Sequence, residues 1–236
     1  MAKAAADKPS GAGEKSRSTA TAMARKRLIA GAVVDILATE GARALTHRRI
    51  DSFLELPLGA TSYYFPRRFE LLKAGFNRMF DDGFEEFTRC YRAVIQRIDA
   101  DEPLDVELTA TAAHRHWKAI TQPSRRDLAI ARFEFYLLAT HDPKLLAVQN
   151  ERRRQVFELM IRVFTALGCR NARRAASEFS SRAQGDYISH FIAPSLIQTE
   201  RTPEELAVRI RQIIAESDAI QADRTSAQGQ AALIAI

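Results

Sequence analysis

Hydroxyl, imidazole and guanidinium side chains are concentrated between residues 46 and 68, in the segment THRRIDSFLELPLGATSYYFPRR. Groups of these kinds donate hydrogen bonds to phosphate oxygens, and a small residue such as Ala60 lets a thymine methyl approach closely. The segment therefore predicts contact with a nucleic-acid backbone rather than catalysis.

Positive charge is concentrated in the same part of the chain. The net charge of the 236 residues is +6, and residues 1–68 hold twelve Lys or Arg against six Asp or Glu, which accounts for all of it. Residues 69–236 hold twenty-three of each sign. A polyanionic partner that meets only the N-terminal third explains this division.

Other chemistries find little support in the sequence. His114 and His116 are two residues apart, so on a helix they point in diverging directions, and no Cys or carboxylate cluster completes a metal site. Cys90 and Cys169 suggest ordinary buried thiols. A helical enzyme is one alternative, but there is no Gly-rich phosphate loop and no Ser/His/Asp arrangement, so no catalytic residue and no cofactor are predicted. A scaffold that binds only protein is a second alternative, but such a protein has no need to confine its excess of positive charge to one end of the chain.

The N-terminal elements are three helices separated by clear breaks. Residues 1–22 are rich in Ala, Lys, Ser, Gly and Thr and are predicted to form a disordered basic tail. Helical spacing of apolar residues begins near Met23 and stops at Gly41. Thr46 can cap a short second helix, and Pro66 ends a third that begins at Ala60.

The rest of the chain predicts a larger helical body. An amphipathic helix is expected from about 68 to 98, and further helices at about 105–121, 124–140, 143–167, 171–193 and 203–219. We predict an all-α fold with a DNA-binding domain at 23–68, a helical domain at 69–220 and a flexible tail at 221–236; for the helical domain, the family resemblance described below implies effector binding and dimerisation. Because no apolar run is long enough for a membrane span and no secretory signal is visible, no membrane partner and a cytoplasmic location are expected.

Three short stretches of the head resemble a known family. Leu45-Thr46-His47-Arg48-Arg49-Ile50, then Leu56-Pro57-Leu58-Gly59-Ala60-Thr61-Ser62-Tyr63-Tyr64-Phe65, then Glu70-Leu71-Leu72 resemble the signature of TetR-type transcriptional regulators, and the close resemblance covers residues 25–72. The chain departs from that pattern at Glu55, which stands where a turn glycine is common. Ser62 stands where a tyrosine is common, and Arg67 replaces a capping Ser or Asn.

The resemblance implies a helix-turn-helix from about Leu45 to Phe65 that binds double-stranded DNA. One of Tyr63 and Tyr64 is expected to pack inward while the other faces phosphate, and the pattern leaves open which does which. The expected DNA-binding residues are Thr46, His47, Arg48, Arg49, Leu58, Gly59, Ala60, Thr61, Ser62, Tyr63, Tyr64 and Arg68.

The resemblance also implies a function for the body. A small-molecule effector is expected to bind among its helices and to release the protein, as a repressor, from a palindromic operator. Apolar stripes on the last two helices could complete the monomer core. The resemblance implies that these helices pair with their copies in a homodimer, which would place two recognition helices about 34 Å apart. Candidate cavity residues are His114, Trp117, Phe133, Tyr136, Phe157 and Met160.

Overall fold

The computed structural model describes the backbone of residues 11–234 and the side chains of residues 19–220. Every regular element in that part of the chain is helical, as predicted. The elements are α1 (Gly11–Glu40), α2 (His47–Phe53), α3 (Ala60–Tyr64), α4 (Arg68–Cys90), α5 (Arg92–Asp99), α6 (Val106–Ile120), the 3₁₀ turn η1 (Pro123–Arg125), α7 (Arg126–His141), α8 (Pro143–Ala166), α9 (Ala172–Ile192) and α10 (Pro203–Ile234).

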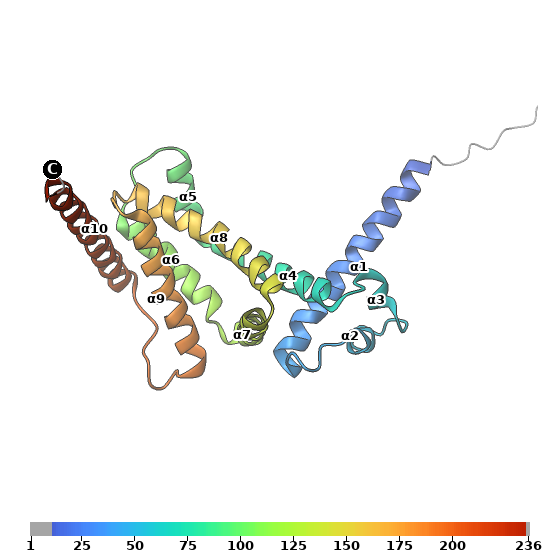
Figure 1. Ribbon diagram of the computed structural model, residues 1–236. Coiled ribbons are helices and arrows are strands. Elements are labelled where there is room, and N and C mark those ends of the chain that lie inside the picture. Colours follow the sequence, from blue (N-terminus) through green and yellow to red (C-terminus); the bar gives the residue numbers. More distant parts are fainter. Residues whose placement is uncertain (1–10, 235–236) are drawn as a thin grey trace, which may run out of the picture.

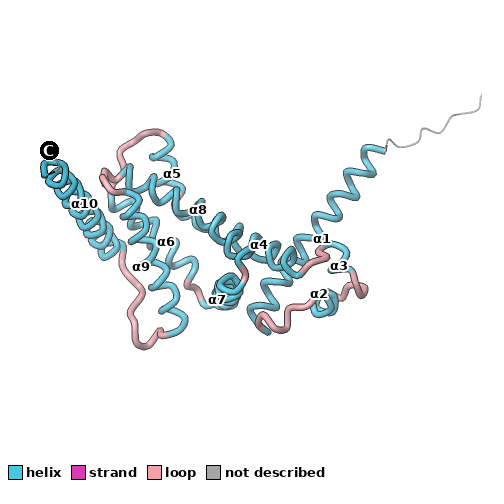
Figure 2. The backbone as a smooth tube through the Cα atoms, in the orientation of Figure 1, coloured by secondary structure: helices cyan, strands magenta, loops and turns pink. Residues whose placement is uncertain are grey.

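The helices form an elongated molecule with a small head at one end (Figure 1). Helices α1 to α3 make the head, and α4 runs from the head into a body built from α5 to α10 (Figure 2). The long helices of the body lie alongside one another, and the longest connection between them is the ten-residue segment 193–202 between α9 and α10. A single helix, α4, is therefore part of both the head and the body.

The head core forms where α1 crosses α4 and α7. Ile29, Val33, Ile36 and Leu37 recur at helical spacing on α1 and are completely buried. Phe135 of α7 belongs to the same buried cluster, so the head packs directly against the body.

Gly75 permits the close approach of α1 and α4. A Cβ atom at this position would lie 2.4 Å from Val33 Cγ1 and 2.8 Å from Val33 Cβ. Any side chain there would force the two helices apart, so the fold requires glycine at a position where nothing in the sequence marks one.

The body core joins α4, α6, α8, α9 and α10. On α10, Ala207, Ile210 and Ile213 are buried in this core, and the helix packs mainly against α6. The apolar stripe that suggested a dimer contact on the last helix is therefore used inside the monomer.

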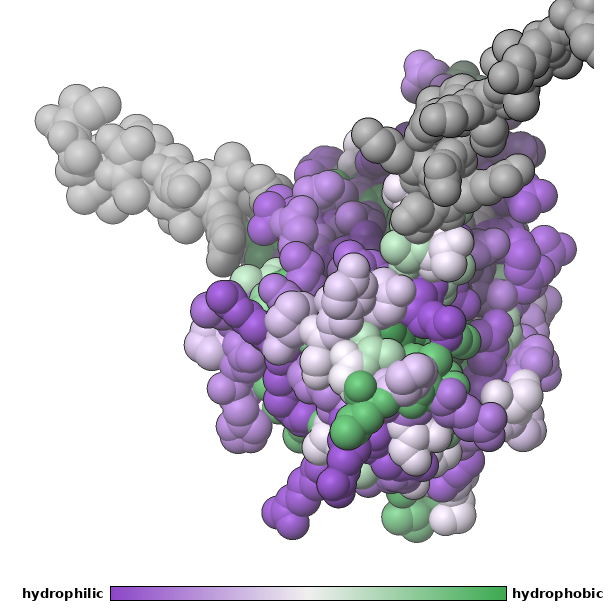
Figure 3. All heavy atoms as spheres, turned by 90° about the vertical axis from the view of Figure 1, so that its right-hand side faces the viewer, coloured by the Kyte–Doolittle hydropathy of each residue, from purple (hydrophilic) through white to green (hydrophobic). Residues whose placement is uncertain are grey.

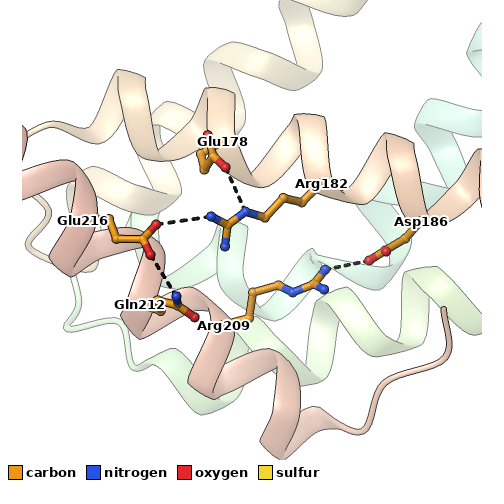
Figure 4. Close-up of polar contacts among 6 residues, drawn as sticks. All are labelled: Glu178, Arg182, Asp186, Arg209, Gln212 and Glu216. Atoms are coloured by element: carbon orange, nitrogen blue, oxygen red, sulfur yellow. Dashed lines mark hydrogen bonds and ion pairs between the residues drawn. The ribbon is translucent and has the colours of Figure 1, made fainter. Parts of the chain in front are cut away.

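Ion pairs fasten α9 to α10 (Figure 4). Arg182 of α9 contacts Glu178 at 2.8 Å on its own helix and Glu216 of α10 at 3.2 Å. One turn further along α9, Asp186 accepts from Arg209 of α10 at 2.6 Å. These contacts fix the angle between the last two helices.

Three boundaries differ from those expected. Helix α1 begins at Gly11 rather than near Met23, and α10 continues to Ile234 beyond the expected end near 219. Both extensions lack proline inside them, and a helix that is already nucleated adds residues at little cost. Residues 1–10 and 235–236 of the two expected tails lie outside the described part.

The expected helix at 68–98 is divided at Tyr91. This residue ends α4 with φ −92° and ψ 9°, and its ring is buried and stacked on Phe87 at 4.4 Å. The change of direction lets Val94 of α5 enter the same core. Between residues 11 and 234, none of the helices is long and apolar enough to cross a membrane.

Candidate functional site

The first helix of the predicted helix-turn-helix begins at the predicted cap. Thr46 has extended backbone angles, and its Oγ1 accepts a hydrogen bond from the Arg49 N–H at 3.0 Å. The N-cap role of Thr46 is confirmed, while its phosphate contact stays a prediction.

The turn between α2 and α3 depends on two left-handed residues. Glu55, which replaces the usual glycine, has φ 51°, and Gly59 has φ 89°. A residue with a Cβ atom is strained in this region by roughly 1–3 kcal/mol, so the turn keeps its shape despite an unfavourable residue. The backbone at Glu55, where a turn glycine is common in the family pattern, therefore carries this strain.

Asp51 holds the recognition helix in place, and sequence reasoning missed it. Its buried carboxylate accepts from the Gly59 N–H and from the Thr61 N–H, both at 2.8 Å. Helix α3 has no capping side chain of its own, because Gly59 is its N-cap. A short helix without a local capping side chain, beginning nine residues after Asp51, was the signal available in the sequence.

The protonation of Asp51 follows from these contacts. Burial by itself raises the pKa of the Asp51 carboxyl, but hydrogen bonds from Thr61 and from the Gly59 N–H outweigh it and lower the pKa below its usual value. Asp51 is therefore a carboxylate at neutral pH, as the negative partner of a helix N-terminus should be.

The two tyrosines of α3 have different environments. Tyr63 is 80% exposed, whereas Tyr64 is partly buried and packs against the head core. Their rings meet edge to face with centroids 5.0 Å apart. The expected division between the tyrosines thus places Tyr64 inward and Tyr63 outward.

The other residues of the turn and α3 also divide by exposure. Leu58, Gly59 and Ser62 are exposed, and Ala60 is partly exposed. Thr61 is completely buried, so it is not part of the exposed face, and its N–H binds Asp51; its expected contact with DNA is untested. Figure 3 views the molecule from the head end, where the surface is mostly hydrophilic with a small hydrophobic area.

Of the two arginines at the start of α2, only Arg48 points away from the protein. Arg48 is exposed and makes no hydrogen bond or ion pair within the described residues. Arg49 instead holds Glu40 through two hydrogen bonds, Nε to Oε2 at 2.9 Å and Nη2 to Oε1 at 2.6 Å. This pair ties α2 to the end of α1 and engages the guanidinium that was expected to meet DNA.

His47 and Arg68 also bind the protein itself. His47 Nε2 donates to the Phe65 carbonyl at 2.7 Å, which joins the start of α2 to the end of α3. Arg68 donates to the carbonyls of Leu45 and, at 3.0 Å, Ala42, in the loop between α1 and α2. Both side chains therefore position the helix-turn-helix, and their expected contacts with DNA are untested.

A cavity of about 720 Å³ lies in the body, within the size range of small-molecule sites. Its wall comes from α4, α6, α7, α8, α9 and α10 and from the loop before α10. Most of the wall is aromatic or aliphatic, and its aromatic members are Phe76, Phe80, Phe84, Phe87, Tyr91, His116, Trp117, Tyr136, Phe157, Phe179 and Tyr187.

Four of the six candidate cavity residues line this space, namely Trp117, Tyr136, Phe157 and Met160. The other two do not. His114 Nδ1 hydrogen-bonds with the Arg201 carbonyl at 2.9 Å, and Phe133 packs edge to face with the rings of Tyr187 and Phe191.

His116, not His114, is the histidine of the cavity. The two side chains leave α6 in different directions, as their spacing predicts, and His116 faces the α4 aromatics with its ring 5.2 Å from Phe87. Burial, reinforced by the nearby Arg132, lowers the pKa of His116 to about 4, so its imidazole is neutral at pH 7. The described residues contain no group of three or more His, Cys, Asp or Glu side chains placed to hold a metal ion.

A basic helix-turn-helix head joined by one helix to an all-helical body with a cavity is also the arrangement of solved transcriptional regulators. Residues 104–216 match the family model described as the tetracyclin repressor-like C-terminal domain. No protein of curated function matches the sequence significantly.

Solved structures of regulators share this fold. A transcriptional regulator from Rhodococcus sp. Rha1 is 17% identical, with a TM-score of 0.66 over 82% of this chain and 97% of that one. A regulator from Saccharomonospora viridis in complex with choline is 15% identical, with a TM-score of 0.61 over 82% and 96%. A TetR-family regulator from Mesorhizobium loti is 12% identical, with a TM-score of 0.61 over 84% and 97%. The chain therefore has the fold of TetR-family transcriptional regulators, and residues 104–216 match the C-terminal domain of that family.

Proposed function

We propose that this protein is a cytoplasmic repressor that binds a palindromic operator through its head and leaves it when a small molecule occupies the body. The observation that carries the proposal is the continuity of α4. Its first residue, Arg68, binds the loop before α2, and its middle part lines the 720 Å³ cavity. A ligand that binds more tightly to one position of α4 would shift the population of head positions toward it. The size of that shift is limited by the difference in the ligand's affinity for the two positions.

In this proposal the DNA contacts come from the exposed face of the helix-turn-helix. Arg48, Leu58, Gly59, Ser62 and Tyr63 would approach the DNA, because they are exposed. Tyr63 and Ser62 offer hydroxyl donors, and Arg48 offers a cation, to phosphate oxygens. Behind this face, Asp51, His47, Arg49 and Arg68 would hold the two helices at a fixed angle.

The proposal includes a homodimer built on α9 and α10. With the inner face of α10 buried in the monomer, the contact would use the outer face of this pair, where Ile192 and Val208 are 70% and 64% exposed. Exposed apolar side chains next to a fixed pair of helices are typical of an interface between subunits. Light scattering of the purified chain should give twice the monomer mass.

The repressor function can be tested by a gel-shift titration on the DNA upstream of the protein's own gene across a range of salt concentration. If about 6–10 phosphates are contacted per dimer, affinity should fall by roughly 10³–10⁵ between 50 and 200 mM salt. Absent binding, or binding insensitive to salt, would contradict the proposal.

Tyr63 and Tyr64 offer a matched pair for the recognition helix. Replacing Tyr63 with Phe removes only an exposed hydroxyl and is expected to weaken operator binding by roughly tenfold without changing stability, as loss of one hydrogen bond to a charged group should. Tyr64→Ala is expected instead to destabilise the head, because its ring packs on the core. Gel shifts and thermal melts of both variants separate these effects; unchanged DNA binding by Tyr63→Phe would remove Tyr63 from the interface.

A further inference from the structure

The cavity of the body has an electrostatic character that the proposed function does not specify. Six arginines line it, Arg132, Arg153, Arg154, Arg173, Arg201 and Arg209, against two carboxylates, Glu158 and Asp186. A largely apolar space with an excess of one sign of charge on its wall concentrates the field and favours a ligand of the opposite sign. The wall therefore selects for negative charge.

Most of these arginines already have partners. Arg209 and Arg201 share Asp186 at 2.6 and 3.6 Å. Arg153 hydrogen-bonds Gln184 of α9 and lies 5.5 Å from the centre of the Tyr136 ring. These contacts hold the helices of the body together, although the buried Nε of Arg201 makes no hydrogen bond.

Arg132 of α7 and Arg173 of α9 differ from them, because neither makes a hydrogen bond or ion pair within the described residues, but Arg173 is exposed to solvent. The guanidinium of Arg132 is partly buried and lies 5.0 Å from the centre of the Tyr187 ring. A partly buried guanidinium on the cavity wall that has no acceptor within the protein leaves its N–H donors available to an anionic ligand.

Gly83 makes the room for this guanidinium. A Cβ atom at Gly83 of α4 would lie only 3.2 Å from Arg132 Nη2. The glycine sits within a wall of α4 rings, where Phe80 and Phe84 stack at 5.8 Å and Phe87 and Tyr91 at 4.4 Å. From Phe76 to Tyr91 this wall extends for about 22 Å.

We propose that the effector is an amphipathic organic anion, with a carboxylate bound by Arg132 and an elongated apolar body laid along the aromatic wall of α4. The proposal rests on the proposed ligand response of this cavity and names the class of ligand. Because Arg132 touches α4 at Gly83, a carboxylate bound there would act on the helix that carries the head.

The test compares three probes of equal length, decanoate, decan-1-ol and decylammonium, with the full chain. Trp117 is the only tryptophan and lines the cavity, so its fluorescence reports binding of these transparent probes, with calorimetry as a second readout. Decanoate should bind about tenfold more tightly than the alcohol, as expected for a hydrogen bond to a charged group, and the ammonium should bind more weakly than either. Equal or tighter binding of the alcohol or the ammonium overturns the proposal.

Variants assign the preference to one side chain. Arg132→Gln should bind decanol as the unaltered protein does but lose the tenfold advantage of decanoate, whereas Arg132→Lys should keep a preference for the carboxylate. Arg126→Gln is the control, because Arg126 is exposed on the same helix outside the cavity and its loss changes the net charge equally. A decanoate preference that survives in Arg132→Gln overturns the assignment.

Gel shifts with operator DNA distinguish the two proposals. If decanoate binds through Arg132 while the DNA stays bound, the inferred ligand class stands and the proposed ligand response fails. If a different compound releases the DNA but decanoate shows no advantage over decanol, the response stands and the inferred class fails.

Discussion

Replacing Gly75 with alanine is expected to destabilise the protein by about 3 kcal/mol, the upper end of the cost of overpacking a core. The new Cβ would lie 2.4 Å from Val33 Cγ1 and 3.3 Å from Phe135 Cζ. Both neighbours are completely buried side chains, so neither can move into solvent. For a chain of this size the melting temperature should fall by about 6–12 °C, measured by circular dichroism.

Gly31 provides the control for this substitution. It lies on α1, and a Cβ atom there would meet no other atom within 4 Å. Gly31→Ala should therefore stabilise the helix by about 0.5–1 kcal/mol, the ordinary gain from removing a glycine inside a helix. A similar gain at Gly75 would show that α1 and α4 are not packed as described.

A second substitution tests whether the destabilisation by Gly75→Ala comes from a steric clash with Val33. Val33→Ala removes the γ carbons that the new Cβ would meet. The double variant Val33→Ala with Gly75→Ala should be less destabilised than the sum of the two single variants, with a coupling of about 0.5–3 kcal/mol. Additive effects would mean that the strain arises elsewhere. Because α1 carries the head and α4 lines the cavity, Gly75→Ala should also weaken operator binding.

Replacing Asp51 with asparagine is expected to release the recognition helix. The carboxylate accepts two backbone N–H groups at 2.8 Å, from Gly59 and Thr61, and an asparagine can accept only one while it turns a donor toward the other. Leaving a buried N–H without a partner costs about 1–3 kcal/mol. Operator binding should fall by at least about tenfold, because α3 loses its fixed position.

The contribution of Asp51 to the free energy of unfolding should decrease at acidic pH. Its pKa is lowered in the folded protein, so its contribution to stability is complete above the unfolded-state pKa of about 4 and is lost as pH falls through the folded-state value. The difference in unfolding free energy between the unaltered protein and Asp51→Asn should be constant from about pH 5 to 7 and narrow below about pH 4. Urea melts at several pH values measure this.

Ser52→Ala is the matched control for Asp51→Asn. Ser52 is the next residue on α2, is exposed and makes no side-chain hydrogen bond in the described part of the chain. It should leave both stability and operator binding within experimental error. Equal losses in the two variants would mean that α2, rather than the link to α3, is the sensitive element.

The sequence by itself determined the helices, the turn and the basic head, because these depend on local chemistry. The Thr46 cap, the glycines at 41 and 59 and the apolar spacing of α1 each act over a few residues, and all are found where the sequence predicts them. The start of α1 and the end of α10 were misplaced because helix ends without prolines or caps carry no local signal.

Only the tertiary structure decided what the polar residues of the head do. Arg48 and Arg49 are neighbours in the first turn of α2, yet one is exposed and the other binds Glu40 of α1. Thr61 and Ser62 are equally plausible donors by type, but Thr61 is buried against Asp51. Such choices depend on partners nine or ten residues away in the chain, which no local pattern encodes.

The residues of the cavity also divide into those that local sequence patterns predicted and those that only the packing of the helices determined. The sequence indicated that aromatic residues of the central helices would surround a ligand, and four of the six named residues do. It could not choose between His114 and His116, because that depends on which side of α6 meets α4 and which meets the loop at Arg201. Nor could it show that Gly83 makes room for Arg132, since the two are 49 positions apart and meet only when α4 packs on α7.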